Sequence, residues 1–189
     1  MPLARHSLRR GAASTLVCVP NSVPPPQGAH VVPVVSAGEM LAAVQEHLEA
    51  SDAVIMTAAV ADFRPTTAHP GKIKKSGREK MVLEMEATPD ILREISRKKG
   101  KRVLVGFAAE TDNVTEEARK KLLAKDLDLI VANDITVPGA GFESDTNQVE
   151  MITRSGRRIP VPLLPKEEVA ERVLDQVSGL LRQEGAEDQ

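Results

Sequence analysis

An uncharged run that ends on a carboxylate constrains the fold of this chain more than any other feature. The run extends from Ala53 to Ala61, and Asp62 follows it directly. A continuous apolar segment bounded by a polar residue is typical of a central strand in a parallel sheet, where both faces are buried. The strand would place Asp62 at its C-terminal edge, which is where open α/β sheets bind their ligands.

A basic loop follows this strand closely. Three lysines, Lys72, Lys74 and Lys75, fall within four residues, and the stretch from Lys72 to Lys80 holds five basic residues against one acidic residue. A charge run of this kind is often only the solvated tip of a hairpin. Beside a strand-end carboxylate, however, mobile ammonium groups suit a triphosphate or the charge that develops on a phosphoryl group. The two features together indicate a nucleotide site.

The rest of the chain alternates strand and helix patterns. Further strands are expected at Ser14–Val19, His30–Val35, Arg102–Gly106 and Asp128–Ala132. Helices are expected after two capping signals, Ser36 with Glu39 and Asn113 with Glu116, and also at Pro89–Ser96 and from Pro165 onward. Residues Gln148–Thr153 and Arg157–Val161 predict a hairpin around Ser155-Gly156, and Lys80–Met85 suggests a ribbon with the Lys72 region.

This order predicts an α/β fold. We expect a Rossmann-like, doubly wound, mostly parallel sheet in three layers, with an appended β hairpin. The chain of 189 residues suits one domain, residues 1–189, with a polar tail at 182–189.

Composition excludes several function classes. The net charge of −2 and the lack of aromatic residues among the lysines argue against nucleic acid as a partner. No apolar stretch approaches the ~18 residues of a membrane span, and the single cysteine, Cys18, fits a reducing compartment. We therefore expect a cytoplasmic protein that binds no membrane. The four histidines lie far apart in the sequence, so no zinc site is expected.

The motifs resemble one family. Ala58-Ala59-Val60-Ala61-Asp62-Phe63-Arg64-Pro65 with Lys72-Ile73-Lys74-Lys75 is similar to the signature of bacterial phosphopantothenate–cysteine ligase, also called phosphopantothenoylcysteine synthetase. The likeness continues, in the family's order, through Thr88–Ile91, Gly106–Thr111, Ala132–Ile135 and Gly141–Asn147, and it covers roughly Ser14 to Leu181. Members of this family usually form the C-terminal half of a bifunctional coenzyme A biosynthesis protein.

The resemblance implies an activity and its substrates. The family joins 4′-phosphopantothenate to cysteine at the expense of CTP, through an acyl-cytidylate, and releases pyrophosphate and CMP. It also implies Mg²⁺ with the triphosphate, no flavin in this domain, a homodimer and an association with a phosphopantothenoylcysteine decarboxylase domain. Asp62 and Glu110 are candidate magnesium ligands, although ribose contact or a structural hydrogen bond is as good an interpretation of either.

The resemblance also implies site residues. Lys72 would be catalytic by stabilising the intermediate, with Lys74 and Lys75 in a flap above it. The positions that match the family's CTP contacts are Ala58, Ala59, Val60, Asp62, Lys72, Pro89, Asp90, Ile91, Leu92, Phe107, Lys121 and Lys125.

The start of the chain departs from the family pattern. The family begins with a strand and a Gly-rich loop, and no such loop or GxGxxG motif occurs here. We therefore expect an N-terminally truncated domain. A catalytically impaired nucleotide-binding domain is the alternative function. A Rossmann-type oxidoreductase is disfavoured by the missing glycine motif.

Overall fold

The structure, a computed structural model, describes residues 1–67, 71–74, 79–111, 113–140 and 144–186. Its main sheet has five strands, in the order β3-β6-β7-β8-β9. These are β3 (Ala53–Met56), β6 (Val103–Glu110), β7 (Leu129–Asp134), β8 (Thr146–Thr153) and β9 (Arg158–Pro165). The first three strands run parallel, and β8 and β9 form the appended antiparallel hairpin.

Two strand pairs lie outside the main sheet. β1 (Thr15–Cys18) pairs in parallel with β2 (His30–Pro33), and β4 (Phe63–Pro65) pairs antiparallel with β5 (Met85–Ala87). Within the described ranges, β1 has no other strand partner than β2, and β3 has no other than β6. The parallel part of the fold is therefore divided between two sheets that do not pair with each other.

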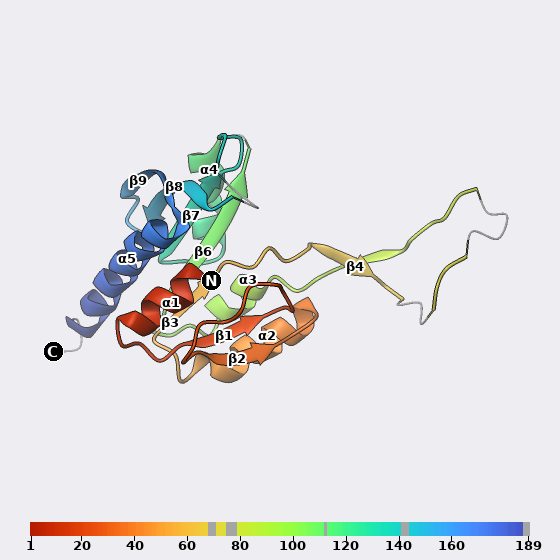
Figure 1. Cartoon of the computed structure of the whole chain (residues 1–189), viewed down its shortest axis with the longest axis horizontal. Helices are drawn as coiled ribbons and strands as arrows, with labels where there is room; N and C mark the ends of the chain where they lie inside the picture. The colour runs from red at the N-terminus through yellow and green to blue at the C-terminus, as the bar shows by residue number, and fades with distance from the viewer. Residues whose placement is uncertain (68–70, 75–78, 112, 141–143, 187–189) are drawn as a thin grey trace.

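Helices cover the sheets on both sides (Figure 1). α2 (Ala37–Leu48), α3 (Ile91–Ser96) and α4 (Val114–Ala124) contribute to one apolar cluster, to which β1 and β2 also contribute. α1 (Pro2–Arg9) and α5 (Lys166–Ala186) contribute to the second cluster, on the opposite face of the main sheet. The three-layer α/β architecture predicted from the sequence is confirmed.

The central strands are apolar on both faces because each face meets a different cluster. In β6, Leu104 and Ala108 point to the cluster under α2, α3 and α4, whereas Val103 and Val105 point to the cluster under α5. Gly106 lies between Leu104 and Ala108 in β6, tightly packed against the first cluster. A Cβ there would approach Leu127 Cδ1 to 2.7 Å.

The C-terminal helix packs as its sequence pattern predicts. Val169, Val173 and Val177 recur along α5 and are buried in the second cluster, with Leu181 partly buried beside them. α5 continues through the first part of the predicted polar tail, as far as Ala186. Arg, Gln and Glu are good helix formers, and they extend the helix beyond its packed face.

β3 is shorter than the sequence predicts. The expected strand reached Ala61, but pairing with β6 ends at Met56, opposite Gly106. From Thr57 the chain leaves the sheet, and Ala58 and Ala59 are exposed. Alanine has little preference for strands. Asp62 therefore follows a loop that crosses the edge of the sheet.

Capping differs from expectation at three helices. Ser36 Oγ accepts from Glu39 N–H (3.2 Å), but Glu39 Oε2 accepts from Val35 N–H (2.8 Å), one residue before the predicted partner. Pro89 was expected in the first turn of α3; the N-cap is instead Asp90. Asn113 precedes α4 as predicted, yet it adopts a left-handed conformation (φ 46°) and its side chain makes no capping hydrogen bond.

A long arm, on which β4 and β5 lie, extends from the body (Figure 1). Among the described residues of the arm, the expected ribbon between Lys80–Met85 and the Lys72 region is not formed, and the pairing joins β4 to β5 instead. Thr66 N–H extends that pairing by donating to Glu84 O (3.0 Å). Large apolar side chains are exposed along the arm, among them Val82, which is 92% exposed.

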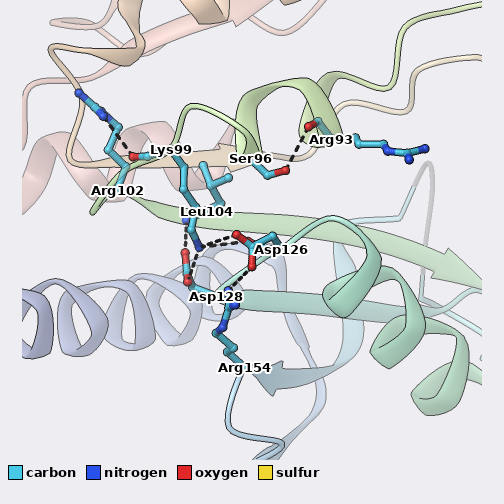
Figure 2. A network of polar contacts seen from close by, with 8 residues as sticks. All are labelled: Arg93, Ser96, Lys99, Arg102, Leu104, Asp126, Asp128 and Arg154. Carbon is cyan, nitrogen blue, oxygen red and sulfur yellow. Dashed lines mark hydrogen bonds and ion pairs between the residues drawn. The ribbon is translucent and has the colours of Figure 1, made fainter.

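An ion network fixes the chain where α4 leads into β7 (Figure 2). Lys99 Nζ donates to Asp128 Oδ1 (2.7 Å) and to Asp126 O (3.0 Å). Asp128 Oδ2 accepts from Leu104 N–H (2.7 Å), and Arg154 pairs with Asp126 Oδ1 (2.5 Å). Asp126 is left-handed (φ 50°). The network therefore holds the tight turn that directly follows Lys125.

None of the helices in the described ranges combines the length and the apolar character needed to cross a membrane.

Candidate functional site

A small open cleft lies at the C-terminal edge of β3. Its volume is about 160 Å³, below the ~300–1,000 Å³ of most ligand pockets, so it can enclose only part of a nucleotide. Eleven residues line it: Met56, Ala58, Val60, Asp62, Thr88, Pro89, Asp90, Ile91, Leu92, Phe107 and Lys125.

The loop after β3 forms one wall of this cleft. Val60 packs against the apolar cluster beneath it, which anchors the loop, while Asp62 stays exposed. Thr88 ties this wall to the next one: its hydroxyl donates to Ala61 O, and its N–H donates to Asp62 O (2.8 Å). The peptide groups from 58 to 62 and from 88 onward are therefore held in a fixed relation.

The N-terminus of α3 forms the second wall. Asp90 caps this helix by accepting from Arg93 N–H (3.3 Å) through Oδ1, and its Oδ2 pairs with Lys125 Nζ (3.1 Å). Ile91 and Leu92 are buried and fix the helix against the core. Lys125 thus reaches the cleft from the C-terminal end of α4 and is positioned by the capping carboxylate.

Lys121 lies one helical turn before Lys125 and outside the cleft lining. Its Nζ pairs with Glu110 Oε1 at 2.6 Å, at the C-terminal end of β6. Both lysines predicted to contact phosphate therefore already contact a carboxylate. A bound phosphate would have to compete with, or bridge beside, Asp90 and Glu110.

Lys72, the predicted catalytic residue, is exposed on the arm and does not line the cleft. The arm extends away from the body (Figure 1). Lys74 is exposed on the same arm, whereas Lys75 lies outside the described residues. Of the described residues in the basic loop, neither Lys72 nor Lys74 joins Asp62 in lining the cleft.

Polar residues at the end of β7 lie near the same edge of the sheet. Thr136 donates to Asp134 Oδ1 from its hydroxyl (2.6 Å) and from its N–H (2.9 Å), and these two bonds lower the pKa of the Asp134 carboxyl. Asn133 Oδ1 is buried and accepts no hydrogen bond. Asp134 thus has a local turn role, which is common for aspartate.

The residues of the cleft fit a magnesium ion only as part of a metal–triphosphate complex. Over the described ranges no three His, Cys, Asp or Glu side chains gather as a metal site would require. Two carboxylates line the cleft, Asp62 and Asp90, and Asp90 is already engaged by Arg93 N–H and Lys125, which leaves Asp62 for a metal ion. One carboxylate suffices when phosphate oxygens and water supply the other ligands of Mg²⁺.

A second hollow, of about 570 Å³, lies beside α4 and the β8–β9 hairpin. Glu150 borders it, accepting from Thr115 Oγ1 (2.6 Å) and pairing with Arg158 (2.8 Å). None of the site residues predicted from the sequence lines it. We therefore take the smaller cleft as the candidate site.

Most of the predicted nucleotide-contacting residues line one cleft. The exceptions are Ala59, Lys72 and Lys121. Sequence reasoning missed Met56 and Thr88 as lining residues. Met56 was missed because the predicted strand continued to Ala61, which placed Met56 in the middle of the strand instead of at its end. Thr88 could have been identified, since it begins the Thr-Pro-Asp motif that leads into α3. The lining alone does not assign a ligand.

Comparison with known proteins identifies the family. The family described as DNA/pantothenate metabolism flavoprotein C-terminal domain matches residues 1–181. The coenzyme A biosynthesis bifunctional protein CoaBC of Bacillus subtilis is 45% identical over 184 residues, which are 97% of this chain and 45% of that protein. The Escherichia coli K12 protein of the same name is 41% identical over 178 residues, 93% of this chain and 44% of that protein.

A solved structure agrees with these matches. The C-terminal domain of a coenzyme A biosynthesis bifunctional protein CoaBC is 40% identical, with a TM-score of 0.82 over 96% of this chain and 81% of that one. The chain spans less than half the length of the curated relatives it matches. The resemblance drawn from the sequence motifs is confirmed. The chain belongs to the DNA/pantothenate metabolism flavoprotein C-terminal domain family.

Proposed function

We propose that this chain is a CTP-dependent phosphopantothenate–cysteine ligase domain of coenzyme A biosynthesis. The observation that carries the proposal is the cleft at the end of β3, where Asp62, Phe107 and Lys125 meet the N-terminus of α3 in a chain of this family. The two CoaBC proteins compared above are named for coenzyme A biosynthesis. The extent of the match, less than half of their length, makes the activity a proposal for this chain.

The reaction has two substitutions. A carboxylate oxygen of 4′-phosphopantothenate attacks the α-phosphorus of CTP, forming a P–O bond while pyrophosphate leaves. The cysteine amine then attacks the acyl carbon of the acyl-cytidylate, forming a C–N bond while CMP leaves and the amine loses a proton. Both steps build negative charge on oxygen, so positioned cations and peptide N–H groups are the expected catalytic means.

The cleft suits the base and the adjoining part of the nucleotide. Cytosine offers an amino donor beside two acceptors, and fixed peptide groups can match that pattern. The segments 58–62 and 88–92 are such groups, because Thr88 holds them together and Ile91 and Leu92 are buried. The wrong base would leave peptide groups unpaired, at about 1–3 kcal/mol each.

Lys125 and Lys121 would extend the site toward the phosphates. Each is held by a carboxylate, at 3.1 and 2.6 Å respectively, so each has a defined position before nucleotide arrives. Mg²⁺ bound with the triphosphate would neutralise part of its charge, and Asp62 is the residue that would hold it. A contact between Asp62 and ribose is the other assignment of that carboxylate.

Lys72 would act only after the arm has moved, or from the arm of another copy. An ammonium group on such an arm can meet charge that develops during reaction, and an interaction of this kind affects kcat more than binding. Exposed apolar side chains on the arm, including Phe63 and Leu83, also support the homodimer that the sequence resemblance implies. Light scattering after gel filtration tests that state.

The experiment that tests the function has two readouts. Calorimetric titration with CTP and with UTP measures nucleotide selection, and pyrophosphate release is then followed with CTP and 4′-phosphopantothenate, with and without cysteine. Preferential CTP binding with pyrophosphate release is the expected result. No preference for CTP would refute the proposed site, and Lys121→Glu should weaken CTP binding if that lysine contacts phosphate.

A second candidate function is nucleotide binding without efficient turnover. The observation that favours it is the position of Lys72 on an arm outside the cleft. It predicts that CTP still binds in the cleft in preference to UTP, while little pyrophosphate is released. Comparing Lys72→Gln with the unchanged chain distinguishes the two: a large fall in kcat supports the ligase, whereas equal slow release supports the second candidate.

A further inference from the structure

Lys121 and Lys125 are paired with carboxylates that differ in their exposure to water. Lys125 Nζ lies 3.1 Å from Asp90 Oδ2, and the Asp90 side chain is 41% exposed. Lys121 Nζ lies 2.6 Å from Glu110 Oε1, and the Glu110 side chain is only 14% exposed. Water can therefore solvate Asp90 much better than Glu110 when the lysine moves to another anion, so the two separations differ in cost.

The sheet holds Glu110 in place, whereas Lys121 can move. Glu110 is the last residue of β6, where its backbone is paired with Asp134 of β7 and its carbonyl oxygen accepts from Ile135 N–H (3.2 Å). The Lys121 side chain is 46% exposed and carries its ammonium group on a flexible four-carbon stem. When this pair separates, the ammonium group moves and the carboxylate stays at the end of the strand.

The carboxylate that stays behind has little to replace its lysine. In the part of the chain that the structure describes, Lys121 is the cation that contacts Glu110. Asp90, in contrast, keeps the bond that its Oδ1 accepts from Arg93 N–H (3.3 Å). A partly buried carboxylate that loses its charged partner loses a strong hydrogen bond and gains little solvation. Moving Lys121 onto a phosphate therefore costs more than moving Lys125.

We propose that Glu110 lowers the affinity of the site for triphosphate by competing for Lys121, and that it recovers this lysine when pyrophosphate leaves. This inference rests on the proposed function, because it takes the phosphates of CTP as the anions with which Glu110 competes. Lys125 binds phosphate from the position that Asp90 maintains, whereas Lys121 alternates between Glu110 and the nucleotide. Weaker phosphate binding favours turnover, since slow release of product limits the rate of many enzymes.

Calorimetric titration of Glu110→Gln with CTP tests the competition. The amide keeps the length of the side chain but not its charge, so Lys121 is released from the ion pair. CTP affinity should rise by about three- to tenfold, whereas cytidine, which carries no phosphate, should bind as it does to the unchanged chain. An unchanged or lower CTP affinity in Glu110→Gln overturns the proposal, and a lower one would show that the carboxylate positions Lys121 for phosphate.

Glu117→Gln is the matched control. Glu117 pairs with Lys120 at 2.6 Å on an exposed part of α4, so this substitution changes the net charge equally without releasing Lys121. The rise in CTP affinity must be larger in Glu110→Gln than in Glu117→Gln. In a Lys121→Met background, Glu110→Gln should leave CTP affinity unchanged, because Glu110 acts through that lysine. A gain that persists in this background contradicts the competition.

Inorganic tripolyphosphate separates this proposal from the proposed function. It carries the phosphate chain without the base, and Glu110→Gln should tighten its binding by the same factor as for CTP. A chain that does not prefer CTP to UTP, but shows this tightening, refutes the proposed function and supports the competition. Selective CTP binding that Glu110→Gln does not tighten refutes the competition alone, and failure to bind either CTP or tripolyphosphate refutes both.

Two further measurements complete the test. Stopped-flow displacement should show slower release of CTP from Glu110→Gln than from the unchanged chain, and equal release rates would contradict the proposal. Thermal unfolding checks that each variant is folded. If Glu110→Gln is not, Glu110→Thr replaces it with the same expected rise in affinity, because threonine is well suited to a strand.

Discussion

Replacing Lys99 by methionine should destabilise the chain and also disturb the candidate site. Lys99 is 13% exposed and its main partner, Asp128, is 15% exposed, so water can only partly replace the lost ammonium group. The substitution keeps most of the side-chain volume. What it removes is one charge-assisted bond to Asp128 Oδ1 (2.7 Å) and one bond to Asp126 O (3.0 Å).

The size of the loss in unfolding free energy depends on the contacts that Asp128 keeps after the substitution. A hydrogen bond to a charged group contributes about 1.5–3 kcal/mol, whereas breaking a fully buried pair costs about 3–5 kcal/mol. Asp128 retains its bond from Leu104 N–H and some contact with water, so the lower range applies. We expect Lys99→Met to lose about 2 kcal/mol, which is about 4–8 °C in melting temperature for a chain of this size.

Urea and thermal unfolding measure this loss. Lys98→Met is the matched control, because Lys98 is the neighbouring exposed lysine and its removal should change stability by less than about 0.5 kcal/mol. Adding Asp128→Asn to Lys99→Met should recover part of the loss, since it removes the uncompensated charge. A Lys99→Met protein as stable as the control would show that the network contributes no net stability.

The same variant should weaken nucleotide binding. The turn at Asp126, which Lys99 holds, directly follows Lys125. A looser turn spreads the positions available to the Lys125 ammonium group at the cleft. CTP affinity, measured below the unfolding transition, should therefore fall in Lys99→Met and stay normal in Lys98→Met.

Three smaller changes test other parts of the fold. Asp90→Ala removes the cap of α3 and should cost about 1 kcal/mol in urea unfolding, whereas Asp90→Asn should retain most of that stability and lose only the pair with Lys125. Gly106→Val should lower the melting temperature, at a cost of about 1–3 kcal/mol, because even a Cβ would come within 2.7 Å of Leu127. Thr136→Val should raise the pKa of Asp134 toward the ordinary carboxyl value in an NMR titration, since both lowering bonds come from Thr136 and the substitution removes the hydroxyl. Because the folded pKa is lowered, the stabilising contribution of this pair is present at neutral pH and lost as the pH falls, so the two proteins should converge in acid.

Most of the fold was predictable from the spacing of apolar residues, because helices and strands that pack against a core have apolar side chains at regular intervals. The valines of α5 and the apolar run of β6 are examples, and both lie in the predicted elements. Element ends were harder to predict. β3 stops at Met56 because pairing with β6 ends there, although the uncharged run continues to Ala61.

The candidate site was predictable where its residues are close in the chain. The segment around Pro89 and Asp90 lines the cleft because a single helix start positions it. The position of Lys72 was not predictable, because it depends on the path of an arm whose pairing is confined to β4 and β5. The local sequence shows that the loop is basic, but it does not show in which direction the loop extends from the body.

The docking of α1 on α5 has a consequence for folding during synthesis. The two residues of its central contact, His6 and Glu167, are separated by nearly the whole chain. The second apolar cluster also needs Val169, Val173 and Val177 from α5. A chain emerging from the ribosome therefore exposes one face of its main sheet until α5 is free to fold, and contacts of such long sequence separation form slowly.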